Sequence, residues 1–326
     1  MNTKAKYNFT AAVIGTGYMG KKHLEALSNI AENIIVCGND EATGKELSAQ
    51  YGCKFYADYA EMFENEKLDL VSICLPTFLH YDATMKALEH GINVLCEKPF
   101  ASNADEAAEM VALAEKKNLL LMIGHVVRFG KNYEYIRRCV KDNRFGKLIS
   151  FNATREDGTP AWSVGNWLNN AALSGGVVRD LHIHDTDMIV GLLGIPKSVF
   201  TTGNDIICRT LYKYDDAVAY AGAAFRPLGK VPSNRGIDII FEKAWVKIRG
   251  KNLTVYVDND SFEPLENEEF SEFFGPIGVQ NEINYFCHCL ANGEKPLLCM
   301  PEDSFMTMKV NTAESESLKT GSEVFI

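Results

Sequence analysis

The run Val13-Ile14-Gly15-Thr16-Gly17-Tyr18-Met19-Gly20 decides the class of fold. It places glycines at the spacing G-x-G-x-x-G, directly after a short β-branched segment and at the start of an amphipathic one. Gly15 permits a tight turn, Gly17 lets the backbone approach a pyrophosphate, and Gly20 allows a helix to pack closely on a strand. The free N–H groups at the start of that helix would face the anion. The run therefore predicts a strand, a phosphate-binding loop and a helix.

The alternation of strand-like and helix-like runs continues through the first 123 residues. Strands are expected at residues 10–14, 34–37, 70–74, 92–96 and 119–123, and helices at 19–30, 41–51, 81–90 and 104–117. Such alternation predicts βαβ units and a parallel sheet covered on both faces. A glycine-rich turn by itself is found in many α/β proteins, and it is the repeats around this one that favour dinucleotide binding.

After Gly124 the pattern changes to longer alternating segments. A helix-like stretch at 133–141 precedes strand-like runs at 148–154, 205–213, 218–225, 237–241 and 245–248. The turn dipeptides Asp215-Asp216 and Glu242-Lys243 join neighbouring runs and favour hairpins. We therefore expect a dinucleotide-binding α/β domain with a doubly wound parallel sheet (1–123). A second, α+β domain with a large, mostly antiparallel open sheet should follow it (124–326).

The composition excludes several classes of protein. A chain of 326 residues with 46% hydrophobic and 23% charged residues is typical of a two-domain globular protein. Thirty-three basic and forty-three acidic residues give a formal charge of −10, which disfavours binding to nucleic acid or to an anionic membrane surface. The longest aliphatic runs are too short to span a bilayer. A soluble, cytoplasmic protein is expected.

Nine cysteines, an odd number, are scattered mainly through apolar runs. This pattern indicates buried free thiols in a reducing compartment and not a disulfide framework. The cluster Cys287-His288-Cys289 lies in a helix-like segment, where adjacent side chains point in different directions. We therefore expect no metal site there.

The second expected strand ends where a dinucleotide would place its adenosine ribose. An acidic residue at this point binds the 2′-hydroxyl of NAD. Here Cys37 is followed by Gly38, Asn39 and only then Asp40. The glycine and asparagine would leave room for a 2′-phosphate, whereas Asp40 would reach the hydroxyl if the loop is short. The sequence leaves NAD and NADP open as the cofactor.

A lysine follows the strand-like run 92–96, in the sequence Glu97-Lys98-Pro99. Ligands of doubly wound folds bind at the carboxyl ends of the strands, and Pro99 restricts the backbone of this turn. Lys98 would therefore lie near the bound cofactor and could exchange a proton with a substrate hydroxyl. The alternative is a surface lysine paired with Glu97.

A second dense polar segment runs from Ser174 to Asp187. If it is helical from Arg179 onward, Asp180, His184 and Asp187 share one face. A neutral imidazole takes up a hydroxyl proton near pH 7, and a neighbouring carboxylate stabilises the imidazolium that forms. Two alternatives remain open, a helix cap at Asp180 with a solvated face and a metal site that uses His182 with His184.

Together and in this order, the three elements resemble the glucose-fructose oxidoreductase / inositol dehydrogenase (Gfo/Idh/MocA) family over nearly the whole chain. The glycine loop, Glu97-Lys98-Pro99 and the segment from Gly175 to Asp187 correspond to the family's motifs. The resemblance implies a Rossmann domain that binds NAD or NADP, and a second domain whose open sheet receives a sugar or cyclitol. It also implies that Lys98, Asp180 and His184 are catalytic.

The loop chemistry and the resemblance together predict which residues contact the ligands. Cofactor contacts are expected from Gly15, Thr16, Gly17, Tyr18, Met19, Gly20, Gly38, Asn39, Asp40, Leu75, Pro76, Thr77, His80, Glu97 and Lys98. Substrate contacts are expected from Lys98, Arg128, Arg155, Trp162, Asp180, His182 and His184. His182 stands where the family usually has glycine, so an extra imidazole is expected at the substrate pocket.

The expected reaction is reversible oxidation of a secondary hydroxyl on a sugar, sugar derivative or inositol. His184, oriented by Asp180, would accept the proton, and Lys98 would hydrogen-bond the same oxygen. Two alternatives remain, a redox-neutral cycle of oxidation, elimination and re-reduction on a glycoside, and a regulator that binds dinucleotide and sugar without turnover. An exposed sheet face is costly in water, so we expect a homodimer or homotetramer formed through the C-terminal sheet.

Overall fold

The structure, a computed structural model, describes residues 6–227, 232–258, 260–275 and 278–326, and the chain divides into two compact units. Unit 1 consists of Met1–Val126, Trp162–Gly165 and Ile277–Phe305. Unit 2 consists of Val127–Ala161, Asn166–Pro276 and Met306–Ile326. Unit 1 therefore includes a segment from the C-terminal third of the chain in addition to the N-terminal one.

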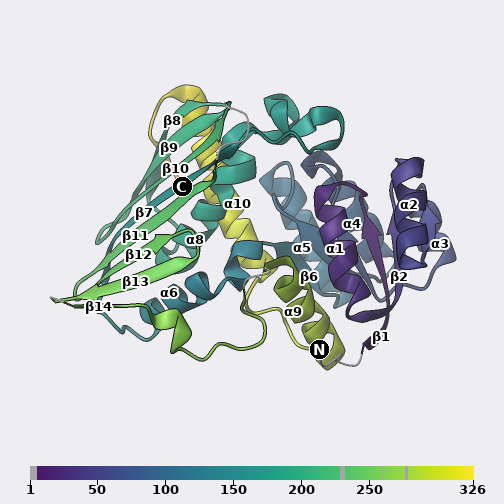
Figure 1. Cartoon of the computed structure of the whole chain (residues 1–326). Helices are drawn as coiled ribbons and strands as arrows, with labels where there is room; N and C mark the ends of the chain where they lie inside the picture. The colour runs from purple at the N-terminus through teal and green to yellow at the C-terminus, as the bar shows by residue number, and fades with distance from the viewer. Residues whose placement is uncertain (1–5, 228–231, 259, 276–277) are drawn as a thin grey trace. The chain divides into compact units, whose positions relative to one another are not determined.

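Unit 1 is built on a parallel sheet with the strand order β3-β2-β1-β4-β5-β6 (Figure 1). Its strands are β1 (Tyr7–Ile14), β2 (Ala31–Cys37), β3 (Lys54–Tyr56), β4 (Leu70–Ile73), β5 (Asn93–Glu97) and β6 (Leu121–Gly124). Its helices are α1 (Tyr18–Ser28), α2 (Glu41–Tyr51), α3 (Tyr59–Asn65), η1 (Thr77–Leu79), α4 (His80–Glu89), α5 (Ala104–Lys117) and α9 (Gly278–Asn292), which contacts α1. The strand order reverses between β1 and β4, and their carboxyl ends border the crevice where such folds bind dinucleotides.

The predicted parallel sheet is confirmed, and five of its six strands are those expected from the sequence. β3 and α3 were not predicted. β3 has three residues, none of them fully buried, at the edge of the sheet, and α3 has seven. Segments this short do not contain enough residues to show a hydrophobic period.

Unit 2 is built on a nine-stranded sheet with the order β14-β13-β12-β11-β7-β10-β9-β8-β15. Its strands are β7 (Leu148–Gly158), β8 (Ser198–Asn204), β9 (Ile207–Lys213), β10 (Val218–Arg226), β11 (Asn234–Phe241), β12 (Trp245–Arg249), β13 (Asn252–Val257), β14 (Asp260–Phe262) and β15 (Val324–Phe325). β7 and β10 pair in parallel, and the other neighbours are antiparallel. The mostly antiparallel sheet is confirmed, as are the hairpins at Asp215-Asp216 and Glu242-Lys243.

One face of the unit 2 sheet packs on helices, which Figure 1 shows along that face. The remaining helices and helical turns of the chain are η2 (Val126–Phe129), α6 (Lys131–Lys141), η3 (Val164–Asn169), α7 (Ala171–Ser174), η4 (Val178–His182), α8 (Ile183–Leu193), η5 (Pro264–Glu266) and α10 (Pro301–Thr320). Inward-facing Phe151 and Ile239 are fully buried in a core with Ile136 of α6 and Ile189 of α8. This core lies on one side of the sheet, and the outer face carries exposed apolar side chains such as Phe200 and Leu211.

No helix in the described part of the chain has both the length and the apolar content needed to cross a bilayer. All nine cysteines are free thiols, and seven of them are buried.

Candidate active site

The glycine loop connects β1 to α1 at the carboxyl edge of the unit 1 sheet. Gly15 has a φ of 113°, and a Cβ on it would lie 2.4 Å from the carbonyl oxygen of Cys74. A Cβ on Gly20 would lie 1.7 Å from the carbonyl oxygen of Gly15. Gly17 occupies the N-cap of α1 and has no side chain to cap the helix, so the first-turn N–H groups are available to an anion. This backbone cradle fits the pyrophosphate of a dinucleotide.

The segment after β2 would lie next to the adenosine ribose. A Cβ on Gly38 would lie 2.8 Å from Cγ2 of Thr16, so the two loops are closely packed. The exposed Asp40 carboxylate caps α2 and accepts hydrogen bonds from the Thr43 hydroxyl at 2.7 Å and the Thr43 N–H at 3.2 Å. These bonds lower the pKa of Asp40 below its usual range. Contact between Asp40 and a ribose stays a prediction.

His80 connects the loops that follow β4 and β5. Its ring is buried, with Nδ1 2.8 Å from the carbonyl oxygen of Pro99 and Nε2 2.8 Å from that of Leu75. Burial lowers the pKa of His80. This predicted cofactor residue therefore holds together the backbone segments that carry Leu75 and Lys98.

Trp162 belongs to unit 1 and lies beside the start of α1. Its ring centroid is 5.0 Å from that of Tyr18, and the ammonium of Lys22 lies 5.0 Å from the Tyr18 centroid. Trp162 is 50% exposed and Tyr18 is 48% exposed. The residue predicted to contact the sugar thus lies against a residue predicted to contact the cofactor, and both rings leave a face open for stacking.

Lys98 is half-buried directly after β5, and Glu97 before it is buried. The Glu97 carboxylate lies 3.0 Å from Nε2 of His23 and accepts the backbone N–H of Lys98 at 3.2 Å. Glu97 was predicted as a cofactor contact, but its carboxylate lies in the interior, where it anchors the Lys98 backbone. His23 was missed by sequence reasoning. Its position three residues after Gly20 is the local signal that could have identified it.

Asp180 lies in the π-helical turn η4, and His184 lies in the first turn of α8. The segment expected to be helical from Arg179 therefore begins as a wider π turn, a geometry that is frequent at functional sites. Between residues 177 and 190 the partly exposed residues are Arg179, Asp180 and His184, and every other residue is buried. The two predicted catalytic residues of unit 2 are thus the accessible carboxylate and the accessible imidazole of this segment.

Two arginines predicted to bind substrate form buried, two-pronged ion pairs. Arg128 donates to the Asp187 carboxylate from Nη2 at 2.7 Å and from Nε at 2.9 Å. Arg155 donates to Asp185 at the same two distances. The Thr307 hydroxyl adds a bond of 2.9 Å to Asp187. These pairs anchor α8 to η2 and to β7, and substrate contact by either arginine stays a prediction.

His182, the last residue of η4, is fully buried. Its Nε2 lies 3.0 Å from the Thr210 hydroxyl, 3.1 Å from the Tyr212 hydroxyl and 3.7 Å from the Glu314 carboxylate. Burial alone would lower the pKa of His182, but the neighbouring Cys208 and Glu314 more than offset it, so that this pKa rises to about 9. The imidazole thus joins the end of η4 to β9 and α10, and its contact with substrate stays a prediction.

A cavity of about 570 Å³ lies within unit 2 between the sheet and helices α6 and α8. Its lining includes Tyr133, Arg155, Asp185 and Arg235. Asp180 and His184 do not line it, so this cavity is separate from the two accessible polar groups of η4 and α8.

Residues 9–125 match the model of an oxidoreductase family with an NAD-binding Rossmann fold, and residues 133–221 match the C-terminal domain of the same Gfo/Idh/MocA family. The chain belongs to the Gfo/Idh/MocA family. Unit 1 of this family member therefore contains an NAD-binding Rossmann domain, in agreement with its glycine cradle.

Relatives of this Gfo/Idh/MocA protein include enzymes of different activity. A myo-inositol 2-dehydrogenase of Thermotoga maritima is 26% identical over 326 residues, covering 94% of this chain and 95% of the relative. A 2,7-anhydro-N-acetylneuraminate hydratase of Mediterraneibacter gnavus is 29% identical over 196 residues, which are 60% of this chain and 52% of the relative. The match thus spans about half the length of the hydratase and of several other curated relatives.

The fold is shared with solved structures over nearly its whole length. A levoglucosan dehydrogenase in complex with NADH and levoglucosan has a TM-score of 0.85 at 18% identity. The similarity covers 98% of this chain and 100% of the other. Identity this low establishes a common fold and leaves the substrate of the present chain to its own residues.

Proposed function

We propose that this protein is an NAD-dependent dehydrogenase acting on a secondary hydroxyl of a sugar, sugar derivative or inositol. The observation that carries the proposal is the exposure pattern around α8. Asp180 and His184 stay partly accessible on a segment whose neighbouring acidic and histidine side chains are buried and engaged. A half-buried Lys98 at the carboxyl edge of the NAD-binding sheet adds the third group that the chemistry needs. The inositol dehydrogenase activity of a relative aligned along nearly the whole chain supports the same reaction class.

Each group has a distinct task in the proposed mechanism. His184 accepts the proton of the substrate hydroxyl, and Asp180 stabilises the imidazolium that results. Lys98 donates a hydrogen bond to the same oxygen as negative charge develops on it. NAD supplies the hydride-accepting chemistry when bound in the cradle of the glycine loop. Asp40, ionised at the N-cap of α2, favours NAD because a carboxylate repels the 2′-phosphate of NADP.

The test is NADH formation, followed by absorbance, with a panel of inositols, hexoses and methyl glycosides. Lys98→Ala and His184→Ala should each lower turnover by about a hundredfold or more, and NAD binding by the His184→Ala protein should stay within about twofold of wild type. NAD affinity is measured separately by calorimetry. A variant with near-normal turnover would remove its residue from the mechanism, and a wild-type protein that binds NAD but forms no NADH would refute the dehydrogenase.

A redox-neutral reaction on a glycoside is the second candidate. Hydratases are among the relatives, at 29% and 27% identity over about 60% of this chain. Such a reaction forms product from an anhydrosugar or glycoside with no net NADH, because the cofactor is reduced and reoxidised in one cycle. Product analysis by NMR in parallel with NADH absorbance separates the two candidates.

We also propose a homodimer or homotetramer formed through the outer face of the unit 2 sheet. Large apolar side chains on this face are 37–56% exposed, namely Phe200, Leu211, Val218, Ile240, Trp245 and Tyr256. Several large apolar side chains exposed on one sheet face indicate an interface in a soluble protein. A second copy of the same sheet is the matching partner for an isologous contact.

A further inference from the structure

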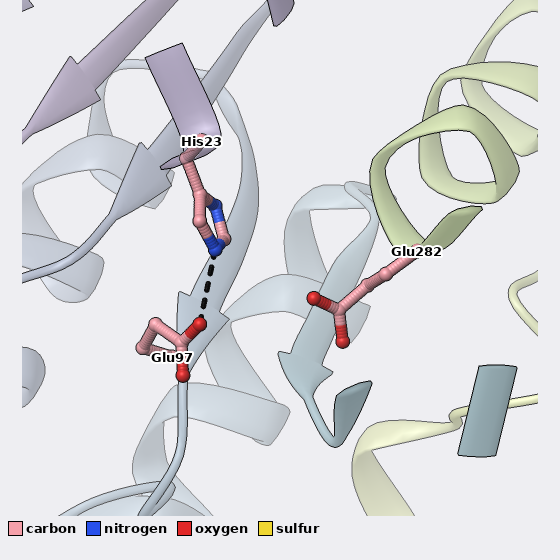
Figure 2. A group of neighbouring side chains, drawn as sticks. All are labelled: His23, Glu97 and Glu282. Carbon is pink, nitrogen blue, oxygen red and sulfur yellow. Dashed lines mark hydrogen bonds and ion pairs between the residues drawn. The ribbon is translucent and has the colours of Figure 1, made fainter. Parts of the chain in front are cut away.

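His23, Glu97 and Glu282 form a buried polar group inside unit 1 (Figure 2). His23 comes from α1, Glu97 from the end of β5 and Glu282 from α9. Their exposed fractions are 0%, 6% and 0%. One ring nitrogen or carboxylate oxygen from each residue lies within 4.8 Å of those of the other two. Three distant segments of the chain therefore bring titratable groups to one point beneath the Lys98 loop.

The polar side-chain atoms of His23 and Glu97 all have hydrogen-bond partners, whereas those of Glu282 have none among the described residues. His23 places Nδ1 2.6 Å from the Ser72 hydroxyl and Nε2 3.0 Å from the Glu97 carboxylate. Glu97 also accepts the backbone N–H of Lys98. The Glu282 carboxyl extends toward the other two in Figure 2, and neither of its oxygens has a hydrogen-bond partner among the described residues. A buried carboxyl group in this position needs a nearby acceptor or donor.

The charges on His23 and Glu97 determine whether the Glu282 carboxyl is protonated. Burial alone lowers the pKa of His23, but neighbouring Cys74 and Glu97 raise it well above its usual value, so an imidazolium faces the Glu97 carboxylate. Burial alone would raise the pKa of Glu97, but the His23 hydrogen bond and the charges of His23 and Lys98 more than offset it and keep Glu97 ionised. A second carboxylate charge in this interior would have no donor to stabilise it. Burial, and then the charge of Glu97, accordingly raise the pKa of Glu282 well above its usual value.

We propose that Glu282 is a neutral acid that shares its proton with the Glu97 carboxylate, and that this pair is a positioning device for Lys98. The Glu282 carboxyl, which lies within 4.8 Å of its neighbours but is not hydrogen-bonded in the structure, reaches Glu97 by rotation of its own side chain. Glu97 then accepts from three donors, the His23 ring, the Lys98 backbone and the Glu282 hydroxyl. Its carboxylate has little room to shift, because a Cβ on Gly124 would lie only 3.3 Å from its Cδ atom. Because the Lys98 N–H donates a hydrogen bond to this carboxylate, a fixed Glu97 side chain also fixes the backbone of Lys98.

The role of this pair in positioning Lys98 rests on the proposed function. The protonation of Glu282 is independent of that function. Glu282→Gln keeps a neutral hydrogen-bond donor of nearly the same shape, and Glu282→Leu removes the donor. Glu25→Gln is the matched control, because Glu25 lies on α1 two residues from His23 and is exposed.

The proton is tested by infrared difference spectroscopy of the full-length protein at neutral pH. The wild type minus Glu282→Gln spectrum should show the carbonyl stretch of a protonated carboxylic acid at a pH where exposed glutamates are ionised, and the wild type minus Glu25→Gln spectrum should not. Taking the difference removes any contribution of Glu314, whose pKa burial also raises. Absence of the band from the wild type minus Glu282→Gln spectrum overturns the proposal. So does a stoichiometric divalent metal, found by elemental mass spectrometry, that Glu282→Gln no longer retains, since the three side chains would then be ligands.

The positioning role is tested by the pH profile of turnover. Glu282→Gln should keep the wild-type profile. Glu282→Leu should lower kcat by about tenfold to a hundredfold and move the acid limb to higher pH, because Glu97 loses a donor and protonates more easily. Equal effects of the two variants, or an unshifted limb in a folded Glu282→Leu protein, refute the positioning role. If no sugar is oxidised at all, the proposed function fails while the infrared result still decides the proton.

Discussion

The ion pair between Arg128 and Asp187 offers a direct test of how α8 is held. Both side chains are almost fully buried, at 6% and 2% exposure, and two charge-assisted bonds join them. Asp187→Asn would leave the guanidinium buried without its counter-charge. Breaking a buried pair by removing one partner costs about 3–5 kcal/mol. The amide oxygen of asparagine still accepts one bond, so we expect about 3 kcal/mol, which is roughly a hundredfold in the folding equilibrium constant.

Urea denaturation followed by circular dichroism measures this loss, with Asp215→Asn as the matched control. Asp215 pairs with Lys197 on the surface, where both side chains are more than half exposed. Its substitution should cost at most about 1 kcal/mol. NAD binding by the folded Asp187→Asn protein should persist, because the glycine loop belongs to unit 1. The reasoning is refuted if Asp187→Asn is no more destabilising than Asp215→Asn.

Three further predictions follow from other parts of the chain. Gly20→Ala should weaken NAD binding by about tenfold or more, because the added Cβ would overlap the Gly15 carbonyl oxygen. Calorimetry measures this affinity, and an unchanged value would contradict the tight packing of the loop. The raised pKa of His182 beside Glu314 should stabilise the fold below about pH 6.5, and this contribution should be lost as the pH rises through about 9. As the pH rises across that range, the urea midpoint of the wild type should fall, and the midpoint of Glu314→Gln should fall less. An equal pH dependence of the two midpoints would argue against the pairing of His182 with Glu314. Leu211→Lys should shift the molar mass from light scattering toward that of the monomer, whereas an unchanged mass would place the interface elsewhere.

The sequence predicted the bounds of a helix correctly where a capping residue stands at each of its two ends. The bounds predicted for α2 and α5 agree with the structure. Asp40 and Asn103 cap their N-termini by accepting backbone N–H bonds, and Gly52 and Asn118 end them in the left-handed conformation. Such caps act within three or four residues, so they can be read directly from the sequence.

The helix α10 was not predicted, and the reason lies in what it buries. Its buried face includes a polar stripe at helical spacing beside the apolar Met308, Val310 and Ala313; this stripe consists of Ser304, Thr307, Asn311, Glu314 and Ser317. A search for apolar periodicity does not detect a helix whose buried stripe is polar. Partners elsewhere in the fold, such as Asp187 for Thr307 and Thr186 for Glu314, make this burial possible.

The sequence by itself determined the dinucleotide-binding loop, the two classes of sheet and the identity of Lys98, Asp180 and His184 as the candidates for chemistry. Each of these depends on residue types at short, regular spacing, where local sterics and hydrogen bonding act. Only the tertiary structure decided that Glu97 faces His23 and Glu282, that Arg128 is paired with Asp187, and that His182 is buried while His184 is accessible. Those outcomes depend on contacts between segments far apart in the chain, which are selected by packing and by the cost of burying unpaired charge.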